Sequence, residues 1–96
     1  MNYLDFDLGH LSGGDVVTVS ISGVESDVML MTASDVHRFA GGGRVAYWGG
    51  HYRTSPAEIS VPGTGVWHVV VVPGPGGRVE AKVSVLRSPG AGGPPW

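Results

Sequence analysis

Apolar residues at every second position are the feature that most constrains how this chain can fold. In residues 15–22, Val17, Val19 and Ile21 share one face of an extended segment, and the residues between them are mostly polar. The same alternation returns in residues 79–85. Because side chains of a β-strand alternate between two faces, this pattern predicts half-buried antiparallel strands.

Further strand-sized segments lie between glycine and proline residues. Residues 65–72 are apolar at both odd and even positions, which predicts a central strand covered on both faces. The remaining strands are expected at residues 3–8, 27–31 and 58–61.

One short helix is predicted to interrupt the strands. The segment from Thr32 to Asp35 fits a capping box, in which both side chains can satisfy first-turn amides. Val36, Phe39 and Ala40 follow as a short apolar stripe, and Gly41 is expected to end the helix in a left-handed conformation.

Composition limits the architecture that these elements can form. The 96 residues include 17 Gly and 7 Pro but no Cys, which excludes disulfides, thiolate metal sites and a cysteine nucleophile. We expect one all-β domain over residues 1–86, an antiparallel, jelly-roll-like β-sandwich of about seven or eight strands with one short helix. Residues 87–96 are expected to form a flexible tail rich in Gly and Pro.

The formal net charge is −2, which argues against a general nucleic-acid-binding protein. Residues 1–37 hold six acids and no Lys or Arg, whereas residues 38–96 hold six Lys or Arg and two acids. We expect these charges to pair within one fold, and self-association through them is the alternative. No apolar run is long enough for a membrane helix, and no export signal is present, so a cytoplasmic location is expected.

The segment Tyr47-Trp48-Gly49-Gly50-His51-Tyr52 is the most distinctive local motif. Two adjacent glycines predict a tight hairpin turn, with the flanking rings paired across its strands. Such rings can also form a binding surface, although a purely structural role is favoured in so small a core. The candidate ligand- or partner-binding residues are Arg44, Tyr47, Trp48, His51, Tyr52 and Arg53.

Other candidate chemistry is weak, so no metal, cofactor or catalytic residue is predicted. The four histidines lack the close spacing of a zinc site, and Asp15, Asp27 and Asp35 are better explained as capping or turn residues. Gly74-Pro75-Gly76-Gly77-Arg78 resembles a phosphate loop but lacks the lysine and the following helix, so a hairpin loop is expected.

Several motifs occur together in one order. They are Leu8-Gly9-His10-Leu11, Gly14-Asp15-Val16-Val17, Asp27-Val28-Met29-Leu30-Met31, Tyr47-Trp48-Gly49-Gly50, Ser55-Pro56, Val61-Pro62 and Gly65-Val66-Trp67-His68-Val69-Val70-Val71. In this respect residues 1–86 resemble the bacterial domain-of-unknown-function family numbered 1883. That resemblance implies a small β-sandwich, found alone or joined to Toll/interleukin-receptor-like domains, with a sensing or docking role and no established catalytic residues. This chain has Val72-Pro73 where an acidic residue is expected after the valine run, and it carries no Toll-like domain of its own.

The function predicted from these observations is a non-enzymatic binding module for a protein partner, acting in bacterial defence or signalling. Two alternatives stay open: a sandwich that binds a carbohydrate or another small ligand, and a self-assembling structural subunit. Nucleic acid and membrane are not expected as partners.

Overall fold

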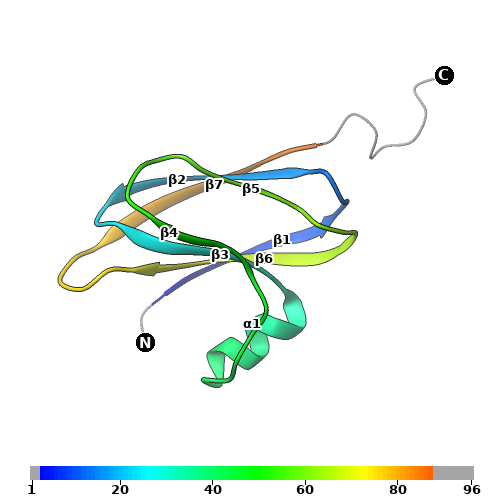
Figure 1. Cartoon of the computed structure of the whole chain (residues 1–96), viewed down its shortest axis with the longest axis horizontal. Coiled ribbons are helices and arrows are strands. Elements are labelled where there is room, and N and C mark those ends of the chain that lie inside the picture. The colour runs from blue at the N-terminus through cyan, green and yellow to red at the C-terminus, as the bar shows by residue number, and fades with distance from the viewer. Residues whose placement is uncertain (1–2, 88–96) are drawn as a thin grey trace.

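The computed structural model describes residues 3–87, so Met1, Asn2 and residues 88–96 of the predicted tail lie outside the described part. Seven strands and one helix follow along the chain (Figure 1): β1 Leu4–Leu11, β2 Val16–Gly23, β3 Ser26–Thr32, α1 Ala33–Ala40, β4 Trp48–Tyr52, β5 Ala57–Ser60, β6 Gly65–Pro73 and β7 Val79–Leu86.

These strands form two antiparallel sheets that face each other (Figure 1). One sheet has the order β1-β6-β3-β4, and the other has the order β5-β2-β7. Val17 and Val19 of β2 join Val28 of β3 and Val69 and Val71 of β6 in a shared buried core. The predicted β-sandwich with one short helix is therefore confirmed.

The four-stranded sheet is buried on both faces at its centre. β6 lies between β1 and β3, as predicted for a segment that is apolar on both faces. Val69 and Val71 point into the sandwich, while Val70 joins Met29 and Met31 of β3 in a second cluster on the outer face. Helix α1 covers this outer face through Val36, and it lies below the four-stranded sheet in Figure 1.

The helix begins at the predicted capping residue. The Thr32 hydroxyl oxygen accepts a hydrogen bond from the Asp35 amide at 3.3 Å. The Asp35 carboxylate accepts from the Thr32 hydroxyl at 3.2 Å, instead of from a backbone amide. The predicted left-handed cap at Gly41 is wrong, because Gly41 has φ −84° and the positive φ occurs one residue later, at Gly42. The left-handed residue thus follows the C-cap Gly41 instead of forming it.

An acidic residue from residues 1–37 pairs with a basic residue from residues 38–96 within the fold. Asp15 is fully buried in the turn before β2, where its carboxylate accepts from the Ser12 amide at 2.9 Å. The Arg87 guanidinium lies 3.4 Å from the same carboxylate oxygen. The predicted turn role of Asp15 is confirmed, and this acid of residues 1–37 has a later base as its partner.

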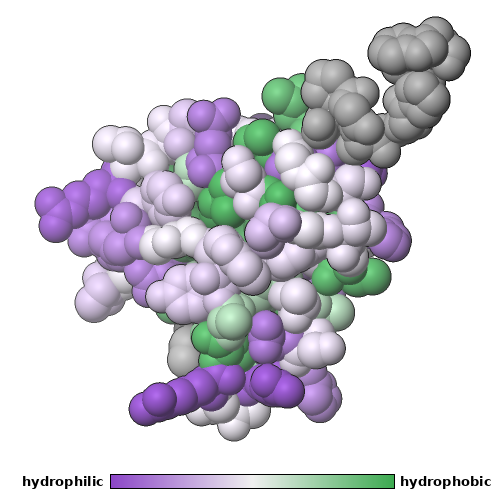
Figure 2. All heavy atoms as spheres, turned by 45° about the vertical axis from the view of Figure 1, so that its right-hand side comes forward, coloured by the Kyte–Doolittle hydropathy of each residue, from purple (hydrophilic) through white to green (hydrophobic). Residues whose placement is uncertain are grey.

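Inward-facing side chains are less completely buried along the side of the sandwich formed by β1 and β7. Inward-facing residues of β7, such as Val79 and Val83, are only half-buried, whereas Val17 and Val19 of the neighbouring β2 are fully buried. Strand β1 continues to Leu11, beyond its predicted end at residue 8. On the face drawn in Figure 2, apolar residues reach the surface in several small patches between hydrophilic ones.

Candidate functional site

Strand β4 carries three of the six predicted site residues, Trp48, His51 and Tyr52, and it lies at the edge of the four-stranded sheet. Within residues 3–87 its only strand partner is β3. The antiparallel register places Trp48 opposite Leu30 and His51 opposite Asp27. The predicted hairpin turn at Gly49-Gly50 is therefore wrong, since both glycines lie inside the strand and the aromatic rings do not pair across a turn.

The backbone conformation at Gly49 explains why a glycine occupies this strand position. Its φ is +129°, a region that residues with a Cβ rarely adopt. A Cβ at Gly49 would also collide with the Val28 carbonyl oxygen of β3. The glycine thus permits a close approach of two strands and does not form a turn.

Trp48 combines a supported ring with an exposed surface. Its ring packs edge-to-face on Trp67, with the ring centroids 5.4 Å apart and the planes at 76°. Trp67 is itself buried and donates its indole N–H to the Gly63 carbonyl at 3.0 Å. Trp48 nevertheless stays 41% exposed, so a fixed aromatic surface faces solvent.

The other two aromatic residues of the motif have different environments. Tyr47 precedes β4 and is 49% exposed. Tyr52 ends β4, is half-buried and packs against the sandwich core. Of the three predicted aromatic contact residues, Tyr47 and Trp48 are therefore available to a partner, and Tyr52 mainly supports the fold.

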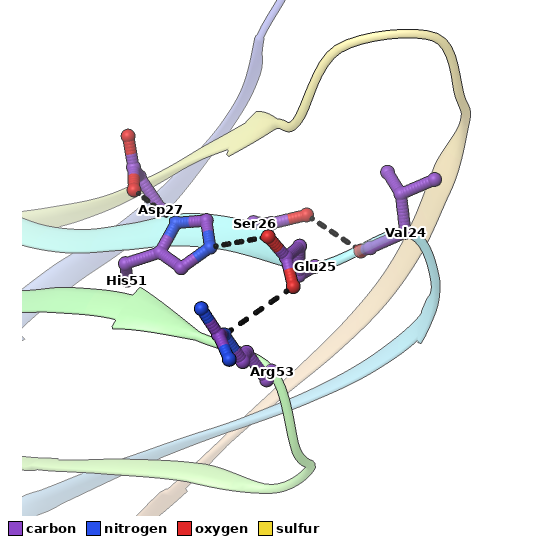
Figure 3. Close-up of polar contacts among 6 residues, drawn as sticks. All are labelled: Val24, Glu25, Ser26, Asp27, His51 and Arg53. Carbon is purple, nitrogen blue, oxygen red and sulfur yellow. Dashed lines mark hydrogen bonds and ion pairs between the residues drawn. The ribbon is translucent and has the colours of Figure 1, made fainter.

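His51 lies between two carboxylates on the outer face of the sheet (Figure 3). Its Nδ1 is 2.8 Å from Oδ1 of Asp27, the residue directly opposite on β3. Its Nε2 is 3.1 Å from Oε1 of Glu25, which precedes β3. Both ring nitrogens are thus engaged, and a doubly protonated ring can donate to both carboxylates at once.

These contacts favour the charged imidazolium. The pKa of His51 is raised above its ordinary value, chiefly by the hydrogen bond to Asp27 and then by that to Glu25. The negative charges of both residues act in the same direction, and desolvation opposes them. Because the ring is exposed to solvent, the added electrostatic stabilisation is screened by water and salt.

Arg53 extends this arrangement by one residue. Its Nε lies 3.5 Å from Oε2 of Glu25, so Glu25 bridges His51 and Arg53 (Figure 3). We call Glu25, Asp27, His51 and Arg53 the His51 cluster. The Arg53 side chain is largely exposed, as expected for a group at the margin of a binding surface.

Arg44 is the predicted site residue that the structure does not join to the others. It lies in the exposed segment between α1 and β4. Within the described residues, no hydrogen bond or ion pair connects its side chain to the His51 cluster or to the aromatic residues. The site is therefore built from β4, its partner β3 and the residues directly next to these strands.

A family model matches most of the chain. Residues 1–89 match the family described as "Domain of unknown function (DUF1883)". The chain belongs to the DUF1883 family. Searches of curated proteins and of solved structures gave no match. The family predicted from the ordered motifs is thus confirmed for this domain.

Two residues of the site in this DUF1883 domain were not predicted from the sequence. Glu25 and Asp27 hold His51, yet they are separated from it by more than twenty positions and become neighbours only through the β3–β4 register. The predicted capping or turn role of Asp27 is wrong, because Asp27 lies within β3 and contacts His51. Only a correct pairing of β3 with β4 could have shown this contact.

A second histidine lies among carboxylates on the same outer face. His68 of β6 has its Nδ1 2.8 Å from Asp5 Oδ1, and its Nε2 is 3.9 Å from Asp7 Oδ1.

Across residues 3–87, no group of three or more His, Cys, Asp or Glu side chains is arranged to hold a metal ion. In the same part of the DUF1883 domain, no helix is long and apolar enough to cross a membrane.

Proposed function

We propose that this DUF1883 domain is a non-enzymatic recognition module that binds an extended segment of a partner protein along β4. The observation that carries the proposal is Trp48, a supported ring that stays exposed on an edge strand. Aromatic residues of this kind contribute much of the binding energy at protein interfaces.

The edge position supplies a second means of recognition. A strand with a neighbour on one side only has backbone N–H and C=O groups directed away from that neighbour. An extended peptide can pair with them as an added strand. Gly49 and Gly50 lie at the centre of β4 and carry no side chain that would obstruct such pairing.

The charged groups near the end of β4 suit the margin of this interface. The His51 cluster presents two carboxylates, an imidazole and a guanidinium on the outer face of the sheet, whereas Trp48, opposite the core residue Leu30, lies on the inner face at the start of the strand. Partly exposed charges of this type select partners and orient them more than they add affinity. Trp48 and Tyr47 would thus supply contact area, and the His51 cluster would supply specificity.

The family resemblance supports a proposal for the biological setting. We propose that the domain occurs in bacteria and acts in the cytoplasm, in defence or signalling, beside proteins that contain Toll/interleukin-receptor-like domains. Its role there would be docking.

Selection of short peptides from a displayed library on the intact chain provides the test. The selected peptides should bind Trp48→Ala at least about tenfold more weakly than the original protein, a loss typical of an interface aromatic. Val66→Ala is the matched control, because Val66 is 47% exposed but lies on β6, and it should change affinity by less than about twofold.

Three results would contradict the proposal. Trp48→Ala could bind the peptides as tightly as the original chain, the peptides could shift NMR signals away from β4, or Trp48→Ala could unfold. The last result would make Trp48 a core residue.

A thermal-shift screen with sugars and nucleotides tests the small-ligand alternative, in which a sugar ring would stack on Trp48. Sedimentation at low and high salt tests self-association.

A further inference from the structure

A pocket lies at the edge of the sandwich opposite β4, away from the site described above. It has a volume of about 220 Å³ and is formed where the start of β1 approaches the connection between β6 and β7. Its lining residues are Tyr3, Leu4, Pro73, Gly77, Arg78 and Val79. Most of these are apolar, and Arg78 is the charged residue among them.

The pocket is open because the two sheets do not close on each other at this corner. Leu4 lies opposite Val71, so its position in β1 faces the core, yet it is 36% exposed. Val79, at the start of β7, packs against the same core but is only half-buried. Apolar side chains that would normally meet in a closed sandwich therefore form the walls of a cavity.

The loop that carries Arg78 is held in place by the neighbouring turn. The Val24 amide donates to the Arg78 carbonyl at 3.0 Å, and the Gly74 amide donates to the Glu25 carbonyl at 2.9 Å. A Cβ at Gly77 would collide with the Val24 side chain, so the two loops are closely packed. Fixed backbone in this wall of the pocket lowers the entropic cost of binding a ligand.

Within the described residues, the Arg78 side chain has no hydrogen-bond or ion-pair partner. No ion pair joins it to Glu25 or Glu80. Glu25 contacts His51 and Arg53, and Glu80 lines a separate hollow that Arg78 also borders. Arg78 thus gives the lining of this pocket a cationic residue that forms no ion pair within residues 3–87, and such a guanidinium can pair with a bound anion.

We propose that this pocket binds a carboxylate that carries a small apolar group. The carboxylate pairs with Arg78, and the apolar group lies between Leu4 and Val79. A guanidinium suits a carboxylate because its N–H groups match the two oxygens. Sites for drug-sized ligands occupy roughly 300–1,000 Å³, so this pocket fits one phenyl or branched aliphatic group. Such a ligand is either a free carboxylic acid or the C-terminal residue of a polypeptide.

NMR titration of the full chain with phenylacetate tests the proposal. Signals of Leu4, Arg78 and Val79 should shift and saturate at millimolar concentration. The neutral analogue phenylacetamide should bind at least about tenfold more weakly, because it has the same shape but no charge. Arg78→Gln should weaken phenylacetate binding about tenfold, whereas Lys82→Gln, a matched charge loss on β7, should change it less than about twofold.

A second titration distinguishes the two sources of the carboxylate. A peptide that ends in a free leucine carboxylate should bind more tightly than phenylacetate if the natural ligand is a C-terminus. Its amidated form should lose this binding. Both results support a carboxylate site and differ only in its source.

The proposal is overturned if acid and amide bind the original chain equally, or if no saturable shift occurs up to about 20 mM phenylacetate. Retention of full affinity by Arg78→Gln also overturns it. The comparison of acid with amide needs no variant, so it decides the question even if Arg78→Gln fails to fold. None of these outcomes bears on binding at β4, which lies at the other edge of the sheet.

Discussion

Strands β6 and β4 belong to the same sheet but differ in almost every property that determines stability. β6 has a strand on each side, and Val69, Val70 and Val71 are all completely buried. β4 has a strand on one side within the described residues, and Trp48 at its start is substantially exposed. The comparison shows that the centre of this sheet maintains the fold, while its edge is free to present side chains.

The largest effect is expected at the centre of the sheet. Leu30 of β3 is fully buried and lies directly opposite Trp48 of β4. The two residues therefore allow a buried and an exposed position to be compared at the same point of the strand pairing. Leu30→Ala should lower the free energy of unfolding by about 2–5 kcal/mol through lost burial and a residual cavity. Urea unfolding followed by tryptophan fluorescence measures this loss in the free energy of unfolding. A loss no larger than that of Trp48→Ala would contradict the difference between centre and edge.

The next largest effect is expected at the point where β4 touches β3. Gly49→Ala should lower the free energy of unfolding by about 1–3 kcal/mol, because of its positive φ and the collision with Val28. Gly50→Ala is the control, since an added Cβ there meets no atom within 4 Å, and its cost should stay below about 1 kcal/mol. Equal losses in the two variants, measured by urea unfolding, would show that the backbone at Gly49 is not constrained.

Trp48→Ala should have a smaller effect than Leu30→Ala. It removes the edge-to-face contact with Trp67 and the buried part of the ring, for an expected loss of about 1–2 kcal/mol. The variant should remain folded by circular dichroism and unfold cooperatively in urea. Loss of cooperative unfolding would place Trp48 in the core and remove it from the candidate site.

The smallest effect is expected at His51, and it depends on pH. Because the folded-state pKa of His51 is raised, its contacts stabilise the fold fully below the unfolded value of about 6.5. That stabilisation is lost as the pH rises through the folded-state pKa. His51→Gln should therefore be less stable than the original chain at about pH 5.5, and the difference should shrink at about pH 8.5.

His10→Gln is the control for this pH dependence. His10 is also exposed on the four-stranded sheet, but within the described residues its ring has no carboxylate partner. Because His10 lacks such a partner, the pH-dependent change in stability should be larger for His51→Gln than for His10→Gln. NMR titration of His51 measures its pKa directly, and a value at or below 6.5 would exclude a favourable interaction with Asp27 and Glu25.

The sequence predicted the elements better than it predicted their contacts. Alternation identified β2 and β7, and the apolar run at residues 65–72 identified the central strand. These signals are local, because each strand's burial pattern is set by its own two faces. The capping residue Thr32 was predicted for the same reason, since a helix start depends on neighbouring residues.

The candidate site was predicted only in part because it depends on strand pairing. Two adjacent glycines favour a turn locally, but the approach of β3 at Gly49 places them within a strand. The carboxylates that hold His51 come from the preceding strand region, and no spacing rule connects them to β4. The pocket at Arg78 likewise depends on how far β1 lies from the start of β7 across the two sheets, which alternation alone does not determine.

Native-state hydrogen exchange of the unbound chain tests most directly whether the β4 edge is separate from the stable centre of the fold. Amides of β3 and β6 that pair with each other should exchange only through global unfolding. Amides of β4 should exchange at least about a hundredfold faster, through local opening. Equal protection of β4 and β6 would contradict the account, because the edge would then be as integral to the fold as the centre.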